Sequence, residues 1–176
     1  MIVVIDFGGQ YCHLIARRIR ALGVYAQIVT ADVKVSEVKK LKPEGIILSG
    51  GPRSVYADDS FSMDKLILDL GIPVLGICYG HQLLSHLLGG RVMPGNKEYG
   101  KETLETGKAR ILKGLKKWEQ VWASHGDTVN TVPKGFNVVG KTKECKIAVM
   151  ENNKKRIYGM QFHPEVNHTP SGNKIL

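Results

Sequence analysis

The sequence has few cysteines, and they do not form a disulfide framework. Its 176 residues include three, Cys12, Cys78 and Cys145, an odd number at irregular spacing. Small secreted domains that depend on disulfides carry an even, closely spaced set. We therefore exclude that class and expect free thiols in a reducing compartment, the cytoplasm.

Long apolar runs and a basic leader are also missing. No stretch approaches the roughly 20 apolar residues needed to cross a bilayer. The chain enters a strand pattern at once, in residues 1–6, without the basic segment of a signal peptide. We expect no membrane partner.

Aromatic residues are scarce, at 7% of the chain, which bears on the basic net charge of +9. Proteins that bind single-stranded nucleic acid interleave aromatic and basic side chains. Here the lysines are scattered, and the densest basic clusters, 113–117 and 152–156, fall at expected turns. We expect no nucleic acid partner. A basic face that meets an acidic protein or attracts an anionic substrate stays open.

The usual metal and nucleotide motifs are absent. Cys-x-x-Cys, His-Glu-x-x-His and Gly-x-Gly-x-x-Gly do not occur. The segment 95–101 resembles a phosphate-binding loop, but Glu102 stands where Ser or Thr would bind magnesium. His163, Glu165 and His168 have the chemistry of zinc ligands, without a supporting zinc motif. We expect no metal and no cofactor on this chain.

The first half of the sequence alternates between strand and helix patterns. The pattern predicts strands at 2–7, 26–30, 45–49 and 73–77 and helices at 10–22, 35–40, 62–70 and 79–88, with Asp58, Asp59 and Ser60 capping the third helix. The second half has β-like segments at 91–93, 108–112, 120–124, 137–140, 146–150 and 156–162. We expect one α/β domain over 1–176, with a mixed, largely parallel sheet flanked by helices and a β-rich second half.

Cys78 lies at the turn between a predicted strand and a predicted helix. Gly76 and Gly80 flank it, and residues without a Cβ atom permit so sharp a turn. The thiol then lies at a helix N-terminus, where unpaired N–H groups favour the thiolate that attacks carbonyl carbon. The alternative is a small apolar core residue, as most free cysteines are.

His163-Pro164-Glu165 follows the apolar run 157–162. Pro164 favours an extended conformation at His163, and residues two apart in an extended segment project to the same side. The Glu165 carboxylate can therefore orient the His163 imidazole. With Cys78, this predicts a nucleophile, a base and an orienting acid.

Two polar loops follow predicted strands. In Ser49-Gly50-Gly51-Pro52 the glycines let backbone N–H groups approach an oxyanion, although an ordinary tight turn has the same composition. Ser124-His125-Gly126-Asp127 suits substrate recognition and equally a capped turn. Because parallel strands end at one edge of a sheet, Gly8-Gly9, the first loop and Cys78 should meet there.

Taken together, these motifs resemble the class I, or triad, glutamine amidotransferase family. The Gly-x-Cys-x-Gly-x-Gln signature of the family stands here as Gly76-Ile77-Cys78-Tyr79-Gly80-His81-Gln82. The resemblance continues in order along the chain through the segments Asp6–Tyr11, Ser49–Tyr56, Ser124–Asp127 and His163–Thr169. It implies a flavodoxin-like fold of the class I glutaminase type.

The resemblance also implies an activity and a role for each site residue. Cys78 attacks the side-chain amide of L-glutamine and forms a glutamyl thioester, His163 transfers a proton to departing ammonia, and Glu165 holds His163. The oxyanion-hole positions of the family match the backbone N–H groups of Gly51 and Tyr79. The positions that hold the amino-acid head of glutamine match Gly50, Gln82, Gly126 and Asp127.

More narrowly, the segments are similar to the glutaminase subunit of two-chain enzymes found in archaea. This resemblance implies a heterodimer whose other subunit, an ATP pyrophosphatase, binds ATP and magnesium and aminates XMP to GMP with the ammonia supplied. Relatives usually continue a terminal helix beyond the point where Asn173–Leu176 end this sequence, so a shortened C-terminus stays open.

Three alternatives remain. The chain could serve another amidotransferase pathway, such as anthranilate or carbamoyl phosphate synthesis, or could be a free-standing γ-glutamyl hydrolase. Ser124–Asp127 and His168-Thr169 argue against both of these. From a different class, it could be a flavodoxin-like regulatory module that binds glutamine or a partner without turnover.

Overall fold

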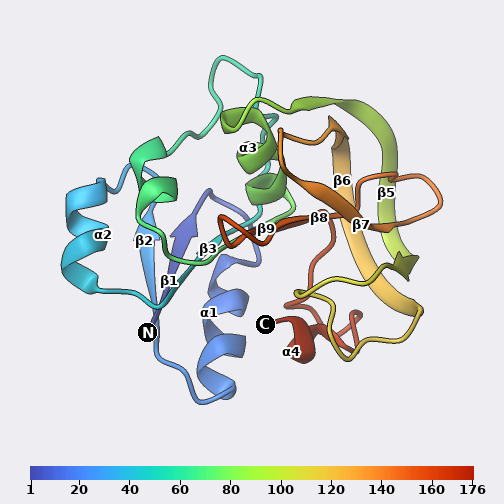
Figure 1. The fold of residues 1–176 in the computed structure, drawn as a ribbon, viewed down its shortest axis with the longest axis horizontal. Coiled ribbons are helices and arrows are strands. Elements are labelled where there is room, and N and C mark those ends of the chain that lie inside the picture. Colours follow the sequence, from blue (N-terminus) through green and yellow to red (C-terminus); the bar gives the residue numbers. More distant parts are fainter.

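A mixed β-sheet runs through the centre of the molecule (Figure 1). The computed structural model describes residues 1–176, apart from the side chain of Asn96. In this part of the chain the sheet has nine strands in the order β2-β1-β3-β4-β9-β8-β7-β5-β6. The strands are β1 (Ile2–Asp6), β2 (Ala26–Thr30), β3 (Gly45–Leu48), β4 (Val74–Ile77), β5 (Arg91–Thr106), β6 (Trp118–Thr131), β7 (Asn137–Lys141), β8 (Val149–Asn152) and β9 (Ile157–Met160).

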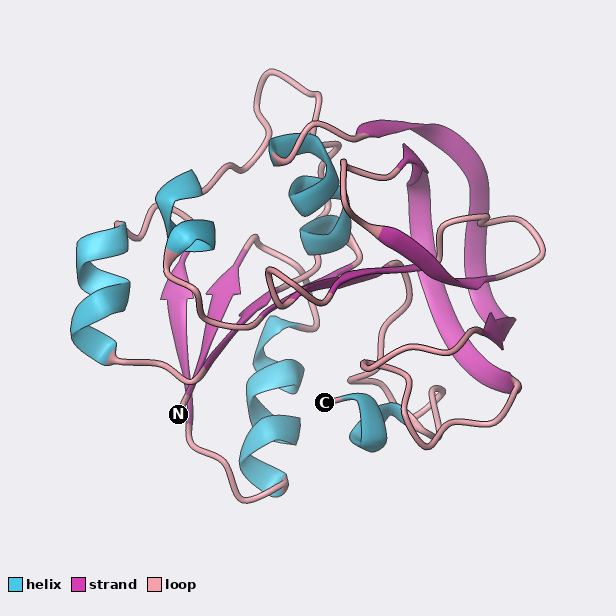
Figure 2. Cartoon of the chain, in the orientation of Figure 1, coloured by secondary structure: helices cyan, strands magenta, loops and turns pink.

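The sheet divides into a parallel and an antiparallel part. Strands β2, β1, β3, β4 and β9 pair in parallel. Strands β8, β7, β5 and β6 extend the sheet with antiparallel pairs, and β5 and β6 form a long twisted hairpin (Figure 2). The predicted fold class, an α/β domain with a mixed sheet and a β-rich second half, is confirmed.

Helices cover both faces of the parallel part (Figures 1 and 2). On one face lie α2 (Val35–Leu41), the 3-10 helix η1 (Lys65–Asp69) and α3 (Tyr79–Leu87). On the other lie α1 (Cys12–Ala21) and the short α4 (Gly172–Ile175). Crossover helices on both sides are what parallel neighbouring strands require.

Each face of the sheet has its own hydrophobic cluster. In β1, Val3 and Ile5 belong to the cluster beneath α2 and α3, whereas Val4 belongs to the cluster beneath α1. Successive strand residues point to opposite faces, so a strand covered on both sides needs an unbroken apolar run. This is why the first half of the sequence shows continuous rather than alternating hydrophobicity.

The hairpin corrects the prediction for the second half. The expected strand at 108–112 is wrong, because these residues form turns between β5 and β6. Leu112 is buried in the core without pairing to a strand. The strand at Lys101–Thr106 was missed because Leu104 is its one apolar residue, and the other residues are held by pairing with β6.

The helix expected at 62–70 is also shorter than predicted. Only the 3-10 helix Lys65–Asp69 forms, and Asp64 caps it by accepting a hydrogen bond from the N–H of Leu66 (3.1 Å). The cap predicted at Asp58, Asp59 and Ser60 is therefore wrong. Asp64 also accepts a hydrogen bond from the N–H of Val35 (2.9 Å), so it joins η1 to the start of α2.

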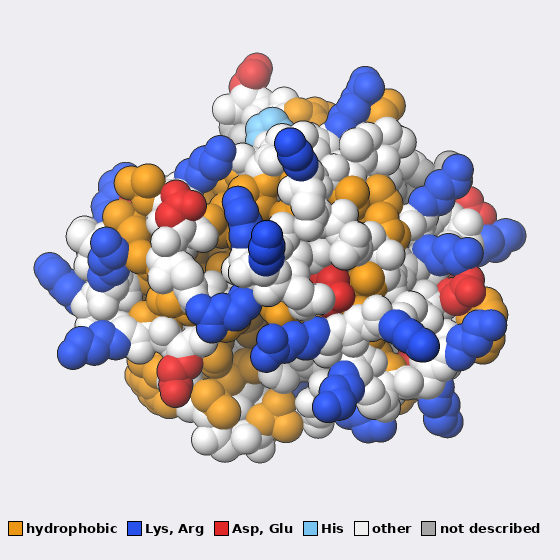
Figure 3. All heavy atoms as spheres, viewed as in Figure 1, with side chains coloured by type: hydrophobic (Ala, Val, Ile, Leu, Met, Phe, Trp, Pro, Cys, Tyr) orange, Lys and Arg blue, Asp and Glu red, His pale blue; other side chains and the backbone are white. Residues whose placement is uncertain are grey.

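Basic side chains are spread over the face of the molecule that Figure 3 shows. On the face shown in Figure 3, Lys and Arg side chains are dispersed and do not gather in one patch. Among the described residues, no helix has the length and apolar character needed to span a bilayer.

Gly80 provides a test of how closely α3 packs on the sheet. A Cβ atom at this position would lie 2.4 Å from the carbonyl oxygen of Leu48 in β3. We expect Gly80→Ala to lower the free energy of unfolding by about 2 kcal/mol or more, because overpacked backbone contacts cannot relax easily. Denaturant unfolding measures the change. His86→Ala, at an exposed position of the same helix, should change it by less than about 0.5 kcal/mol; equal effects would contradict the packing argument.

Candidate active site

Cys78 occupies a strained turn between β4 and α3. Its backbone has φ 52° and ψ −104°, a region that residues with a side chain rarely adopt. The N–H of Cys78 donates to the carbonyl of Met160 in β9 (2.8 Å). A Cβ atom at Gly76 would lie 2.5 Å from the backbone of Gly80, so the turn closes only with a glycine there. Such strain persists where the surrounding structure holds it, often at active sites.

His163 and Glu165 form a buried pair. The Nδ1–H of His163 donates to Oε1 of Glu165 over 2.7 Å. The two residues are 5% and 0% exposed. The backbone carbonyl of His163 accepts a hydrogen bond from the Thr169 hydroxyl (2.7 Å), and the carbonyl of Glu165 accepts one from Nε of Arg18 (2.9 Å). Pro164 and Glu165 lie in a turn and not in the extended segment that the sequence predicted. These contacts fix that turn, and Glu165 still reaches the His163 imidazole.

The His163 imidazole faces the Cys78 sulfur. A Cβ atom at Gly50 would lie 3.2 Å from Cε1 of His163 and 3.7 Å from Cβ of Cys78, so the two side chains meet at the same point. Burial disfavours the protonated imidazole, but hydrogen bonds and charge interactions with Cys78 and Glu165 outweigh burial and raise the pKa of His163 to about 10. The imidazole is therefore a cation at neutral pH, next to the sulfur.

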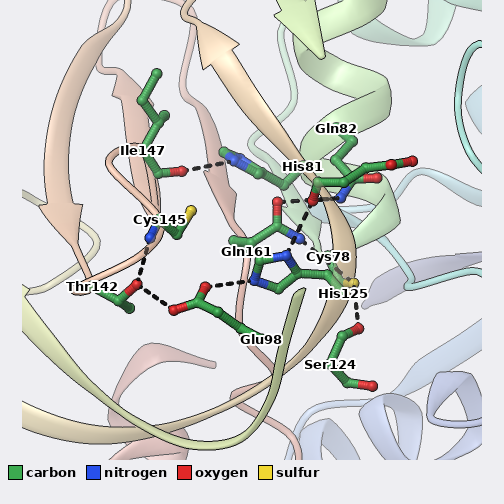
Figure 4. Close-up of polar contacts among 11 residues, drawn as sticks. Cys78, His81, Gln82, Glu98, Ser124, His125, Thr142, Cys145, Ile147 and Gln161 are labelled. Atoms are coloured by element: carbon green, nitrogen blue, oxygen red, sulfur yellow. Dashed lines mark hydrogen bonds and ion pairs between the residues drawn. The ribbon is translucent and has the colours of Figure 1, made fainter. Parts of the chain in front are cut away.

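The sulfur has two further polar neighbours (Figure 4). The carbonyl oxygen of Ser124 lies 3.6 Å from it and can accept from the thiol. The side-chain amide nitrogen of Gln161 lies 3.7 Å from it and donates to it. The sulfur thus lies between an acceptor that suits a thiol and a donor that suits a thiolate.

A cavity of about 520 Å³ opens over the sulfur. Its wall comes from loops far apart in the sequence: Gly8, Gly9, Gln10, Tyr11, Gly50, Gly51, Pro52, Arg53, Ser54, Cys78, Gln82, Tyr99, Ser124, His125, Gly126, Asp127 and His163. Gly8-Gly9, the Ser49–Pro52 loop and Cys78 therefore meet at one edge of the sheet. This volume is ample for a small polar metabolite.

The two expected oxyanion-hole residues lie side by side. Tyr79 is the first residue of α3, so its N–H has no acceptor in a preceding helical turn. A Cβ atom at Gly51 would lie 3.1 Å from Cγ of Tyr79 and 2.8 Å from the carbonyl oxygen of Phe7. Only a glycine fits there, which leaves its backbone exposed to the cavity.

The four residues expected to hold the substrate head also line the cavity: Gly50, Gln82, Gly126 and Asp127. The Asp127 carboxylate accepts hydrogen bonds from the hydroxyls of Ser54 and Tyr56, the latter at 2.8 Å. Gln82 is buried, and its amide nitrogen donates to the backbone carbonyl of Asp127 (2.8 Å). A carboxylate held in this way suits a bound ammonium group.

A second group with the same three residue types lies nearby and is distinct from Cys78, His163 and Glu165. The ligand atoms of Glu98, His125 and Cys145 lie within 4.8 Å of one another, the one such cluster found among the described residues. Both oxygens of Glu98 accept hydrogen bonds, from His125 Nε2 (2.8 Å) and from Thr142 (2.7 Å). Burial and the nearby Glu98 raise the pKa of Cys145 to about 12, which keeps it a thiol. We interpret the group as a hydrogen-bonded cluster rather than a metal site.

His168 and Cys12 do not line the cavity over the sulfur. His168 is exposed and its ring lies 4.4 Å from that of Trp122. Cys12 is the first residue of α1 and is buried in the core. Its pKa is raised to about 12, chiefly by burial and by Asp6.

Four residues of the site were missed by sequence reasoning as contributors to it. Ser54 and Tyr56 hold Asp127, Tyr11 packs its ring edge-on against His163 with centroids 5.0 Å apart, and Gln161 contacts the sulfur. The sequence could have indicated Gln161, because it is a polar residue near the end of the apolar run 157–162. The sequence could not have indicated Tyr11, because its position also fits the apolar face of a helix.

The fold and this site define a class of protein. A model of the class I glutamine amidotransferase family matches residues 3–176. The chain belongs to the class I glutamine amidotransferases, as the motifs predicted.

Within this family, the chain is similar in sequence to GMP synthases. The chain is 53% identical over 180 residues to a GMP synthase (glutamine-hydrolysing) of Streptococcus mutans and 51% identical to that of Streptococcus equi subsp. zooepidemicus, covering 99% of this chain in both cases. It spans only 35% of the length of these relatives.

Solved structures agree with the fold. The chain superposes with a TM-score of 0.88 on a protein assigned as one subunit of GMP synthase from Thermoplasma acidophilum, at 34% identity, covering 99% of this chain and 88% of the other. A glutamine amidotransferase of Thermotoga maritima, 21% identical with a TM-score of 0.74 over 94% of this chain and 76% of the other, shares the fold.

The state of His163 can be measured without a substrate. We expect an NMR titration of histidine-labelled protein to give His163 a pKa near 10, and Glu165→Gln to lower that pKa because the neutral amide no longer stabilises the cation. Cys78→Ala should lower it as well. Circular dichroism checks that both variants keep the fold. A His163 pKa unchanged in both variants would contradict the electrostatic account.

Proposed function

We propose that this chain is the glutaminase subunit of a two-chain GMP synthase. It hydrolyses L-glutamine to glutamate through a thioester on Cys78 and passes ammonia to an ATP-dependent synthetase subunit, which aminates XMP to GMP. The observation that carries the proposal is the sulfur of Cys78 on its strained turn, facing the buried His163–Glu165 pair across a solvent-reachable cavity.

The first step is attack of the thiolate on the side-chain amide carbon of glutamine. A positive neighbour stabilises the thiolate, and His163 supplies it. The carbonyl oxygen gains a negative charge, which the N–H groups of Gly51 and Tyr79 would stabilise. Removing one such donor costs about 3 kcal/mol of barrier in enzymes of known mechanism.

Proton transfer by His163 completes the reaction. As the C–N bond breaks, the imidazolium gives its proton to the departing nitrogen and ammonia leaves. The neutral imidazole then accepts a proton from water, whose oxygen attacks the thioester. Glutamate is released and the thiolate and imidazolium are restored. Glu165 holds His163 in one orientation throughout and stabilises its charge.

We assign recognition of the amino-acid head to residues of the cavity wall around Asp127. The head carries an ammonium and a carboxylate, so it needs acceptors and donors at a fixed distance from the sulfur. The Asp127 carboxylate, already aligned by Ser54 and Tyr56, would accept from the ammonium. Gly50, Gln82 and Gly126 complete that part of the wall.

The need for a synthetase partner follows from the chemistry of ammonia. Ammonia is nucleophilic only when unprotonated, so it must cross to the synthetase through a sheltered interface, and weak hydrolysis before docking would limit its loss. ATP and magnesium would bind to the synthetase in this heterodimer. The name of the similar solved structure, one subunit of a GMP synthase, supports such a division. The three cysteines, all buried free thiols, suit the cytoplasm.

The nucleophile is tested by glutamate release. We expect Cys78→Ala to reduce glutamine hydrolysis about a thousand-fold or more, because no other group forms the covalent intermediate. Cys12→Ala, at a buried position of α1 that does not line the cavity, is the cysteine control and should keep most of the activity. Equal turnover in Cys78→Ala and the parent would remove Cys78 from this role.

The partner is tested in the same assay. We expect the synthetase subunit with XMP and ATP to raise glutamate release and to yield glutamine-dependent GMP. Full hydrolysis by the isolated chain, unchanged on adding these components, would contradict the coupling. No hydrolysis with the partner present would favour a glutamine-binding module instead.

Recognition of the ammonium is tested at Asp127. Asp127→Asn removes the negative charge and keeps the shape, so we expect KM for glutamine to rise about 10-fold or more, as for a lost hydrogen bond to a charged group, with a smaller change in kcat. Asp32→Asn, at an exposed turn distant in sequence, is the control. A fall in kcat with KM unchanged would contradict the assignment.

A further inference from the structure

We propose that Gln161 is a further catalytic residue of this site: its side-chain amide donates a hydrogen bond to the Cys78 sulfur and stabilises the thiolate. The inference rests on the proposed function in taking Cys78 as the nucleophile, and extends it by one residue. Gln161 follows directly after β9 and is 1% exposed.

The orientation of the Gln161 amide is set by a chain of hydrogen bonds that starts at a backbone carbonyl. The carbonyl of Asp127 can only accept, so the side chain of Gln82 must present its nitrogen there, at 2.8 Å. The second N–H of that nitrogen points to Oε1 of Gln161, at 3.2 Å. Because the oxygen of Gln161 faces Gln82, its nitrogen faces the sulfur, at 3.7 Å.

If the side-chain amide of Gln161 were rotated by 180°, this series of hydrogen bonds would be broken. Its nitrogen would then face the nitrogen of Gln82, two donors in contact, and its oxygen would face the sulfur. Both groups are buried, where an unpaired donor costs about 1–3 kcal/mol. The structure therefore assigns a donor, not an acceptor, to the sulfur.

The Asp127 carbonyl, at which this series of hydrogen bonds starts, is itself held by His125 of the second buried group. Nδ1–H of His125 donates to the same Asp127 carbonyl (3.1 Å), and Nε2 of His125 contacts Glu98 (2.8 Å). Thr142 in turn donates to Glu98 (2.7 Å). Figure 4 shows the labelled members of this network around the sulfur. The Glu98–His125 pair therefore has a structural role. It holds the Asp127 carbonyl, which sets the orientation of Gln82 and through it that of Gln161.

The contacts of the sulfur distinguish its two protonation states. As a thiol it donates to the Ser124 carbonyl (3.6 Å). As a thiolate it has no proton to donate, and the carbonyl oxygen then repels it. The thiolate instead accepts from Gln161 and from His163. Hydrogen bonds to an ion are stronger than those to a neutral group, and stronger still in a buried site.

The test is the pH profile of Cys78 alkylation by iodoacetamide, followed by mass spectrometry of the Cys78 peptide. Met has a similar volume to Gln and no donor. We expect Gln161→Met to slow alkylation at neutral pH by about 10-fold, the size expected for a lost hydrogen bond to a charged group, and to move the profile to higher pH. The limiting rate at high pH should equal that of the parent, because the thiolate itself is unchanged. Gln161→Glu should move the profile further in the same direction.

Controls separate this effect from a structural one. Gln27→Met, on the edge strand β2, should superimpose on the parent. A change in the limiting rate without a shift along the pH axis, or a Gln161→Met profile identical to that of the parent, would overturn the proposal. If Met at position 161 prevents folding, Gln82→Met gives the same test. It removes the group that aligns Gln161, so we expect a smaller shift in the same direction, and no shift would overturn the proposal.

Alkylation needs no glutamine, so the two hypotheses can fail separately. A shifted profile in a chain that releases no glutamate even with the synthetase subunit, XMP and ATP present would leave the Gln161 contact standing and remove the glutaminase proposal. Glutamate release with an unshifted profile would do the reverse. With both intact, Gln161→Met should lower kcat for glutamine at neutral pH and recover part of it at higher pH.

Discussion

The parallel pairing of β4 with β9 is the contact on which the site depends. Ile77 pairs with Met160, so both strands end at the same edge of the sheet, and the residues that follow them are neighbours. The hydrogen bond from the N–H of Cys78 to the Met160 carbonyl carries that register one residue further. The nucleophile and the Gln161–Glu165 segment are about 85 residues apart in the chain, and this one pairing brings them together.

Burial makes the members of the site interdependent. Glu165 is fully buried, and Oε2 has no hydrogen-bond partner among the described residues. A buried carboxylate is costly unless a charge compensates it, and His163 provides that charge only while it is protonated. Burial by itself would favour the neutral imidazole, so the cation exists because the acid and the sulfur flank it on two sides. The amide of Gln161 has the corresponding role at the sulfur, since a buried anion needs hydrogen-bond donors as well as a countercharge.

Much of the parallel half could be predicted, because its strands are buried on both faces and its helices have one apolar side. The antiparallel half could not. Residues 101–106 are polar apart from the buried Leu104, and their strand exists through pairing with β6. The apolar Leu112 fills the core from a turn. Local patterns record burial and spacing, whereas this hairpin is held by cross-strand bonds that involve distant residues. In the same way, the contact between Glu98 and His125 could not be predicted, because only the pairing of β5 with β6 brings the two side chains within 2.8 Å.

The sequence by itself determined the identity of the chemistry: a cysteine between two glycines at a strand-to-helix turn, and a histidine and a glutamate two residues apart after an apolar run. These are local relations, set by backbone sterics over a few residues. The tertiary structure alone decided which groups face the sulfur, how the amide of Gln161 is turned, and that the imidazole carries a proton. Those properties depend on burial and on contacts between segments distant in the chain, and neither the dielectric surroundings of a group nor its hydrogen-bond partners exist before the chain has folded.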